Sequence, residues 1–279
     1  MLRVRRTVRV GRSGVPGLNK IRLRYSKTGK AVYISHLDLM TLFARALLRA
    51  GVRLGYSEGF NPHPYISIAL PLPVGCASVC ELADFGTEVM LLPDGLPELI
   101  NNVLPEGITV LEAYTSRRGF NDIAWVGLHG ALHYDAGAPP NTVSRLTERF
   151  SAGSLVITKK TKRGTSDIDI IPYVRDIMFT GRGDNELSPQ QDCGVSPAEI
   201  LLDFSPQRGA ESNRKFIDID IKVSAQNPSI NAENILSAVR GGGSLPDNND
   251  SCEVGGLAIP DFSRFTRMEV YGSNMEVFR

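Results

Sequence analysis

Between residues 19 and 115 the sequence alternates short strand patterns with only two helical ones, in the order strand, helix, strand, strand, helix, strand. This order is typical of a ferredoxin-like unit, in which two helices cover one face of a four-stranded antiparallel sheet. A similar order returns between residues 124 and 279. The sequence therefore predicts an α+β protein of two tandem ferredoxin-like (βαββαβ) units with antiparallel sheets.

The opening strand of the first unit spans about Asn19 to Ser26 and alternates apolar with basic side chains. This period-two pattern indicates a half-buried strand whose apolar side faces a core. A Lys-Thr-Gly-Lys turn follows it. We expect the cationic side chains of the strand and turn to form an outer face that contacts phosphates: Arg22, Arg24, Lys27 and Lys30.

A helix between Ser35 and Gly51 is the best-marked element of the chain. Ser35 is a suitable N-cap, and Asp38 completes a capping box near the positive end of the helix dipole. Arg45 and Arg49 lie one turn apart on the polar face. Such a pair either binds a phosphate or a carboxylate, or is an ordinary solvated pair on a surface helix.

Two histidines flank this helix, His36 at its start and His63 in the Gly- and Pro-rich loop of residues 57–64. If the loop folds back over the helix start, where backbone N–H groups favour anions, both imidazoles would share one pocket. The pocket would bind phosphate, and two imidazoles could act as base and acid at a ribose 2′-hydroxyl. Alternatively, His36 only holds a carboxylate and His63 only shapes the loop. The other expected members of this pocket are Ser35, Arg45, Tyr56 and Asn61.

The second unit includes a hairpin of two strands at residues 155–160 and 167–171. Polar segments near 181–196 and 241–255 interrupt the unit and are expected to be mobile insertions. We therefore expect a basic flexible tail at 1–18, a first domain at 19–115 and a second domain at 124–279. The hairpin tip is either a solvated turn or a phosphate-contacting patch of basic residues: Lys159, Lys160, Lys162 and Arg163.

Charge is distributed unevenly along the 279 residues. The first thirty residues contain ten Lys and Arg and no Asp or Glu, so they carry +10 within a net charge of +1, and the remainder carries −9. A cationic end of this strength attracts RNA or DNA by releasing counterions from the phosphates. A second interpretation of residues 1–18, a solvated tail with no binding role, stays open.

The cysteines and the remaining histidine and acidic pairs point to no metal site. Four cysteines at irregular spacing do not form a disulfide framework, and we expect free thiols. His129 and His133 are four residues apart in a strand pattern, which places them about 13 Å apart on one face. Aspartates alternate with isoleucines at 167–169 and at 218–220, as on the solvated face of a strand.

The composition, 42% hydrophobic and 22% charged, is that of a soluble globular protein. No apolar run is long enough to cross a membrane, and the first residues alternate arginine with valine instead of forming the apolar core of a signal peptide. We expect a cytoplasmic protein without a membrane partner.

Three segments carry a resemblance to a known family: KIRLRYSKTGKAVYISHLDLMTLFARALLRAG at 20–51, YSEGFNPHPYISIALPLPVG at 56–75 and KKTKRGTSDIDIIP at 159–172. They are similar to the bacterial radical-SAM-linked domain of unknown function, which occurs alone or fused behind a radical SAM protein. The match is close over residues 20–84. The resemblance implies a radical SAM partner. The iron–sulfur cluster and S-adenosylmethionine would belong to that partner, because this chain lacks the C-x-x-x-C-x-x-C motif of the enzyme.

Two functions of different class follow as hypotheses. The first is a non-catalytic RNA-binding or substrate-presenting module that acts with a radical SAM enzyme in RNA or ribosome-related modification. The second is a metal-independent RNA-processing or RNA-modifying enzyme that uses His36 and His63. It draws on a looser architectural likeness to CRISPR repeat-associated ribonucleases, which also join two ferredoxin-like units. In both, the chain itself is expected to bind no cofactor.

Overall fold

The computed structural model describes residues 18–139, 141–161, 164–182, 215–241, 253–254 and 257–279. The chain divides into two compact units. Unit 1 is Met1–Asp122 together with Arg279, and unit 2 is Ile123–Phe278. Both units are α+β, and the strand pairings described within each are antiparallel. In the described parts of the chain, no helix is long and apolar enough to span a bilayer.

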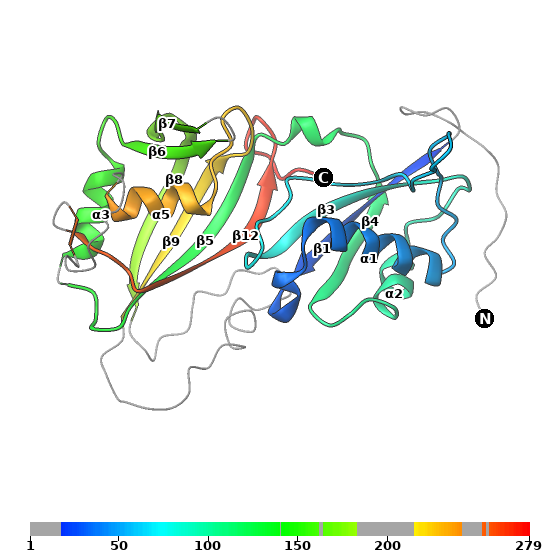
Figure 1. The fold of residues 1–279 in the computed structure, drawn as a ribbon, viewed down its shortest axis with the longest axis horizontal. Helices are drawn as coiled ribbons and strands as arrows, with labels where there is room; N and C mark the ends of the chain where they lie inside the picture. Colours follow the sequence, from blue (N-terminus) through cyan, green and yellow to red (C-terminus); the bar gives the residue numbers. More distant parts are fainter. Residues whose placement is uncertain (1–17, 140, 162–163, 183–214, 242–252, 255–256) are drawn as a thin grey trace. The chain divides into compact units, whose positions relative to one another are not determined.

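The sheet of unit 1 contains, from one edge to the other, β4 (Ile108–Thr115), β1 (Asn19–Lys27), β3 (Ala77–Thr87) and β2 (Ile66–Ile68). The chain passes through β1, η1 (Gly29–Tyr33), α1 (His36–Arg49), β2, β3, α2 (Leu96–Asn101), β4 and η2 (Phe120–Asp122). Figure 1 shows α1 and α2 together against the sheet.

The core of unit 1 lies between this sheet and its two helices. Leu39, Phe43 and Leu47 of α1 are buried at helical spacing. The ring of Phe43 packs edge-on against Tyr25 of β1, with ring centres 4.8 Å apart. Met40 is only half-buried, so the stripe of α1 that faces the core begins at Leu39.

In unit 1, the start of α1 and the start of β4 are set by residues close to them in the sequence. Ser35 is the N-cap of α1, as predicted, and its side chain accepts a hydrogen bond from the backbone N–H of Asp38. Gly107, just before β4, has a φ of 86°, and a Cβ there would lie 2.5 Å from the carbonyl oxygen of Thr28. Between α1 and β2 the chain forms isolated bridges, which pair Leu54 with Thr87 and Tyr56 with Pro64.

The main sheet of unit 2 contains β12 (Phe262–Tyr271), β5 (Trp125–Tyr134), β9 (Lys215–Ser224) and β8 (Val174–Arg182) in that order. The other elements are α3 (Thr142–Phe150), the hairpin β6 (Val156–Thr161) and β7 (Gly164–Asp169), η3 (Ile171–Tyr173), α5 (Ala232–Arg240), and the short pair β10 (Glu253–Val254) and β11 (Leu257–Ala258). The expected insertions near 181–196 and 241–255 and the tail at 1–18 fall almost entirely outside the described residues.

One strand of unit 2 is not where the sequence pattern indicated. The hairpin of β6 and β7 exists but forms a separate two-stranded sheet, and β8 takes the edge position beside β9. β8 was not predicted because its alternation is broken. The register shifts between Arg175 and Met178, and Asp176 has a φ of 49°. A bulge of this kind adds a residue and disrupts the period-two pattern.

Candidate functional site

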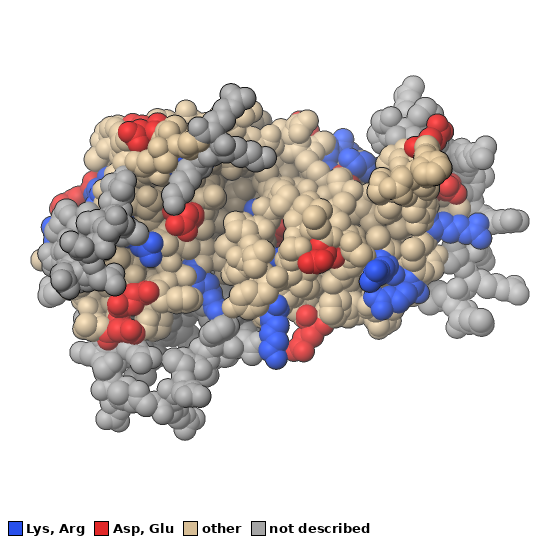
Figure 2. Space-filling model, viewed as in Figure 1, with Lys and Arg blue, Asp and Glu red and all other residues tan. Residues whose placement is uncertain are grey.

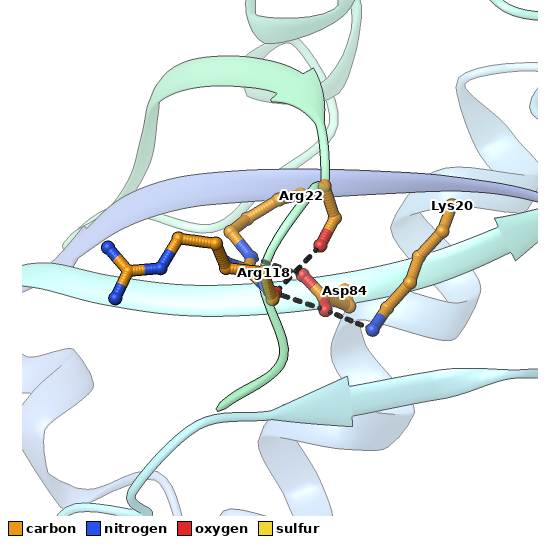
Figure 3. Close-up of polar contacts among 5 residues, drawn as sticks. Lys20, Arg22, Asp84 and Arg118 are labelled. Atoms are coloured by element: carbon orange, nitrogen blue, oxygen red, sulfur yellow. Dashed lines mark hydrogen bonds and ion pairs between the residues drawn. The ribbon is translucent and has the colours of Figure 1, made fainter. Parts of the chain in front are cut away.

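Arg22 lies at the centre of a buried ion cluster in unit 1 (Figure 3). Its Nε and Nη2 donate to the two carboxylate oxygens of Asp84 on β3, at 2.6 and 2.9 Å. Nη2 also donates to the carbonyl oxygen of Arg118 at 2.7 Å, and the guanidinium carbon lies 4.5 Å from the ring centre of Phe120. Lys20 adds a second cation, with Nζ 2.8 Å from Asp84. Because Arg22 is 0% exposed, its predicted place on an outer face is wrong.

Arg24 is also held inside the unit. It is buried, and its Nη1 donates to Oε1 of Glu112 on β4 at 3.0 Å. β3 and β4 flank β1 and each supplies an acidic partner, so the basic alternation of β1 is matched by carboxylates across the sheet. Lys30, in η1, is exposed as expected.

Lys27, the last residue of β1, is buried and holds the segment that leads into α1. Its Nζ donates to the carbonyl oxygens of Val32 and Ile34, at 3.2 and 2.8 Å. Burial lowers the pKa of Lys27, and the negative charges of Glu81 and Cys76 oppose this shift. Lys27 therefore has an internal role, in contrast to the predicted phosphate contact.

The helix start carries Ser35 and His36. The Ser35 hydroxyl donates to Oδ2 of Asp38 at 2.7 Å in addition to accepting the capping hydrogen bond. His36 is half-buried in the first turn of α1, and its buried Nδ1 makes no hydrogen bond to a described residue. Anion binding here would use the free backbone N–H groups of the first turn.

The second histidine lies in the loop of residues 57–63, which we name the Phe60 loop. Its base is closed by Ser57, whose N–H donates to the carbonyl of His63 at 2.8 Å and whose Oγ accepts from the N–H of His63 at 2.9 Å. Tyr56 and Pro64 form a β-bridge just outside this closure. The side chains that the sequence placed in the site, Tyr56, Asn61 and His63, are exposed.

The strand register separates the two histidines. Lys27, which binds the carbonyl of Ile34 near His36, pairs with Ser78 at the start of β3. The residue after Pro64, Tyr65, accepts a hydrogen bond from Gly86 at the other end of β3. Eight strand residues at about 3.3 Å each place these ends about 26 Å apart.

The expected shared pocket is therefore not formed. α1 begins at the η1 end of the sheet and runs away from it, so the loop that follows α1 emerges at the opposite end (Figure 1). His36 and His63 cannot act together on one reacting group, because proton transfer requires contact or one bridging water.

Exposed arginines remain on α1 and after it. Arg45 and Arg49 are exposed one turn apart, and Arg53 is exposed in the segment that follows the helix. Arg49 donates from Nη2 to the carbonyl of Val103 at 3.3 Å, which directs this side chain toward the end of α2. Figure 2 shows Lys and Arg side chains on the surface over α1. This surface can bind an anion at Arg45 without breaking a buried ion pair.

The basic hairpin of unit 2 is only partly described. Lys159 donates from Nζ to the carbonyl of Ser229 at 2.6 Å, a contact within the unit. The side chain of Lys160 and the whole of Lys162 and Arg163 lie outside the described residues, so the predicted phosphate patch at the hairpin tip stays a prediction.

Each histidine of unit 2 lies beside a carboxylate. His129 Nδ1 lies 2.9 Å from Oδ1 of Asp220, and His133 Nδ1 lies 3.5 Å from Oδ1 of Asp135. Asp169 accepts backbone hydrogen bonds at the hairpin, and these lower its pKa. No group of three or more His, Cys, Asp or Glu side chains suited to a metal occurs among the described residues, in which Cys76 and Cys80 are not disulfide-bonded.

Two exposed side chains near the predicted site were missed by sequence reasoning. Phe60 is fully exposed, and Arg53 lies between the end of α1 and the Phe60 loop. Phe60 sits within the Gly-Phe-Asn-Pro-His-Pro segment, but an apolar residue between Gly and Asn gives no sign of whether it packs inward. The Pro residues on both sides of His63 were the available signal that the backbone holds this loop open.

One family model matches the greater part of the chain. The model, described as an uncharacterized protein conserved in bacteria (DUF2344), matches residues 20–201. The matched range contains all but the first residue of β1, and it contains α1, the Phe60 loop and the basic hairpin of unit 2. No curated protein matches the chain. Because the match spans more than half of the sequence, the chain belongs to the DUF2344 family of uncharacterized proteins conserved in bacteria.

Proposed function

We propose that this chain is an accessory RNA-binding module that presents a substrate to a radical SAM enzyme in RNA or ribosome-related modification. The radical SAM partner is supported by the resemblance of residues 20–84 to the radical-SAM-linked domain. In this proposal the partner, and not this chain, holds the iron–sulfur cluster and S-adenosylmethionine. Cys76 and Cys80 are not disulfide-bonded, which suits a reducing cytoplasm, where we propose that the complex acts.

The observation that carries RNA binding is the row of exposed cations Arg45, Arg49 and Arg53. Arginine presents a planar set of donors that suits phosphate, and each phosphate neutralised releases counterions. Arg22 and Arg24 do not count toward this surface, because they pair with carboxylates inside unit 1. The cationic surface is therefore smaller than the charge of the first thirty residues indicated.

A catalytic role for the two histidines has no geometric support. The register of β3 places His36 and His63 at opposite ends of the sheet, and neither imidazole can complete a base and acid pair with the other. This separation favours the non-catalytic function over an enzyme that uses both histidines.

We also propose that both units are ferredoxin-like. The support is that each sheet has the same antiparallel strand order: β4, β1, β3, β2 in unit 1, and β12, β5, β9, β8 in unit 2. In each unit a helix follows the first strand and another precedes the last. The hairpin β6–β7 is then an addition between the first helix and the second sheet strand of unit 2.

RNA binding is tested by titrating fluorescent RNA with purified protein over a range of salt. We expect affinity to fall steeply with salt, and the Arg45→Gln/Arg49→Gln/Arg53→Gln variant to bind more weakly with a shallower dependence. Lys222→Gln is a control, because that cation pairs with Asp176 in unit 2. If the wild type binds no RNA at low salt, RNA binding is excluded.

The partner is tested by isolating the tagged chain from its native cell. The expected result is co-purification of a radical SAM protein that has the absorption of an iron–sulfur cluster, together with RNA that can be sequenced. Purified chain alone should leave this RNA chemically unchanged. Chemical change of the RNA by the purified chain would contradict an accessory role.

A further inference from the structure

The side chain of Phe60 is fully exposed to solvent in a short loop. Its relative exposure is 107%, the highest among the large hydrophobic side chains of the described residues. Tyr56, at the base of the same loop, is 43% exposed. Phe60 therefore contributes nothing to the core. A single exposed apolar residue is ordinary on a protein surface, so its meaning depends on how the loop is held and on what surrounds it.

The Phe60 loop is held by its own backbone. Ser57 closes it through hydrogen bonds to both backbone groups of His63, at 2.8 and 2.9 Å. Outside this closure, Gly86 at the end of β3 donates to Tyr65 and accepts from Gly55, both at 2.8 Å. A ring displayed on such an anchored loop loses little backbone freedom when it binds, because the loop is already ordered.

Two exposed cations precede the loop in the chain, and one exposed acid, Glu88, follows β3. Arg49 ends α1 and Arg53 follows it on the way to the loop, and both are exposed. Leu18 packs at this end as well, because a Cβ on Gly86 would lie 3.3 Å from its Cδ1. Residues 1–17, which join the chain at Leu18, contain five arginines and no acidic residue. This charge favours a polyanion as the occupant over an apolar groove of another protein.

The loop itself carries the opposite charge. Glu58, next to Gly59, is exposed, so a phosphate placed directly on the loop would be repelled. A nucleic acid that reaches this end would therefore place its bases on the loop and its phosphates toward the arginines. Only unpaired bases offer a free face to an aromatic ring, because bases in a duplex are stacked on one another.

We propose that Phe60 and Tyr56 form a stacking surface for unpaired bases of single-stranded RNA, with Arg53 contacting an adjoining phosphate. The proposal rests on the RNA binding proposed above. It adds the form of the strand that is bound, the side chains that contact its bases, and a role for Phe60 that the sequence pattern did not indicate.

The test compares a single-stranded RNA with the same strand annealed to its complement. Affinities are measured by fluorescence anisotropy for the wild type, Phe60→Ala, Phe60→Trp and Phe262→Ala. Phe262 is a matched control, since it is an exposed phenylalanine of unit 2. We expect Phe60→Ala to lose about tenfold or more in affinity for the single strand and nothing for the duplex. Phe60→Trp should retain affinity, and its emission above the Trp125 background should be quenched by the single strand.

Each other outcome has a distinct meaning. If the wild type binds both RNAs and Phe60→Ala changes neither affinity, stacking is wrong and RNA binding stands. If no RNA binds at low salt, both proposals fail. If Phe60→Ala binds RNA normally but no longer retains a co-purified radical SAM protein, the loop contacts a protein and stacking is wrong. Thermal unfolding of Phe60→Ala should match that of the wild type, because the ring has no packing to lose.

Discussion

The guanidinium of Arg22 binds both carboxylate oxygens of Asp84, and both side chains are buried. The pair joins β1 to β3, and the same guanidinium donates to the carbonyl of Arg118 in the segment after β4. A side chain that the sequence pattern placed on an outer face is thus a structural tie between two strands and the segment that leaves the sheet. Its chemistry, bidentate and charge-assisted, is among the stronger polar contacts that a protein makes.

We expect Arg22→Ala to destabilise unit 1 by about 3–5 kcal/mol, because it leaves the buried carboxylate of Asp84 with less compensation. Chemical unfolding followed by circular dichroism measures this change. Arg45→Ala is the matched control, and its effect should stay within about 0.5 kcal/mol because Arg45 is exposed. Equal effects of the two substitutions would contradict a structural role of the ion pair.

Lys27 should give the protein a distinctive alkaline response. Burial lowers its folded pKa below the ordinary value of 10.5. Between the lowered pKa and 10.5 the unfolded chain binds more protons than the folded one, so raising the pH through this window stabilises the folded state. Relative to Lys27→Met, the wild type should therefore gain unfolding free energy as the pH rises from neutral to 10.5. A difference independent of pH would contradict this.

The half-buried Tyr114 and the buried Tyr134 should lower the stability of the folded state at higher pH, which is opposite to the effect of Lys27. Burial raises the pKa of Tyr114 to about 12 and that of Tyr134 to about 12. The stability that each contributes is present below the ordinary value of 10.0 and is lost as the pH rises toward 12. Tyr114→Phe and Tyr134→Phe should lessen the alkaline loss of stability, measured by unfolding at a series of pH values. Tyr33→Phe, an exposed position, serves as the control.

Gly107 tests the packing of η1 against the start of β4. Gly107→Ala should destabilise the protein by about 1–3 kcal/mol, because φ is positive and the new Cβ would press on the Thr28 carbonyl. Gly119→Ala is the control, since nothing lies within 4 Å of a Cβ at that position. Thermal unfolding compares the two. Similar melting temperatures for both variants would argue against the close contact.

His36 and His63 should behave as independent residues. About 26 Å of strand separates the segments that carry them, so the effects of His36→Ala and His63→Ala on RNA affinity should add within about 0.5 kcal/mol. A double-mutant cycle measures the coupling. A coupling of more than about 1 kcal/mol would restore the shared pocket that the register excludes.

The candidate site was predictable where it depends on local sequence. Ser35 and Asp38 identify the start of α1 because capping is a contact between residues three apart. The open backbone of the Phe60 loop follows from its Gly and Pro residues. The sequence did not predict which end of the sheet lies beside the start of α1 and which lies beside the loop after it. This depends on which strands become neighbours.

The basic residues of β1 are a second case in which partners distant in the sequence could not be predicted. Alternation placed Arg22 and Arg24 together on one side of a strand, and this is correct. It did not show that Asp84 and Glu112 lie opposite them on β3 and β4, 62 and 88 residues away in the chain. Charge in the sequence is therefore a poor guide to charge on the surface wherever distant strands supply partners.

The sequence by itself determined the α+β class, the cap and extent of α1, and the non-helical backbone of the loop after it, because each depends on contacts within a few residues. Only the tertiary structure decided which cations are free, where β8 lies and how far His36 is from His63. Those features depend on strand register, and register is set by hydrogen bonds and side-chain contacts between segments that are far apart in the chain.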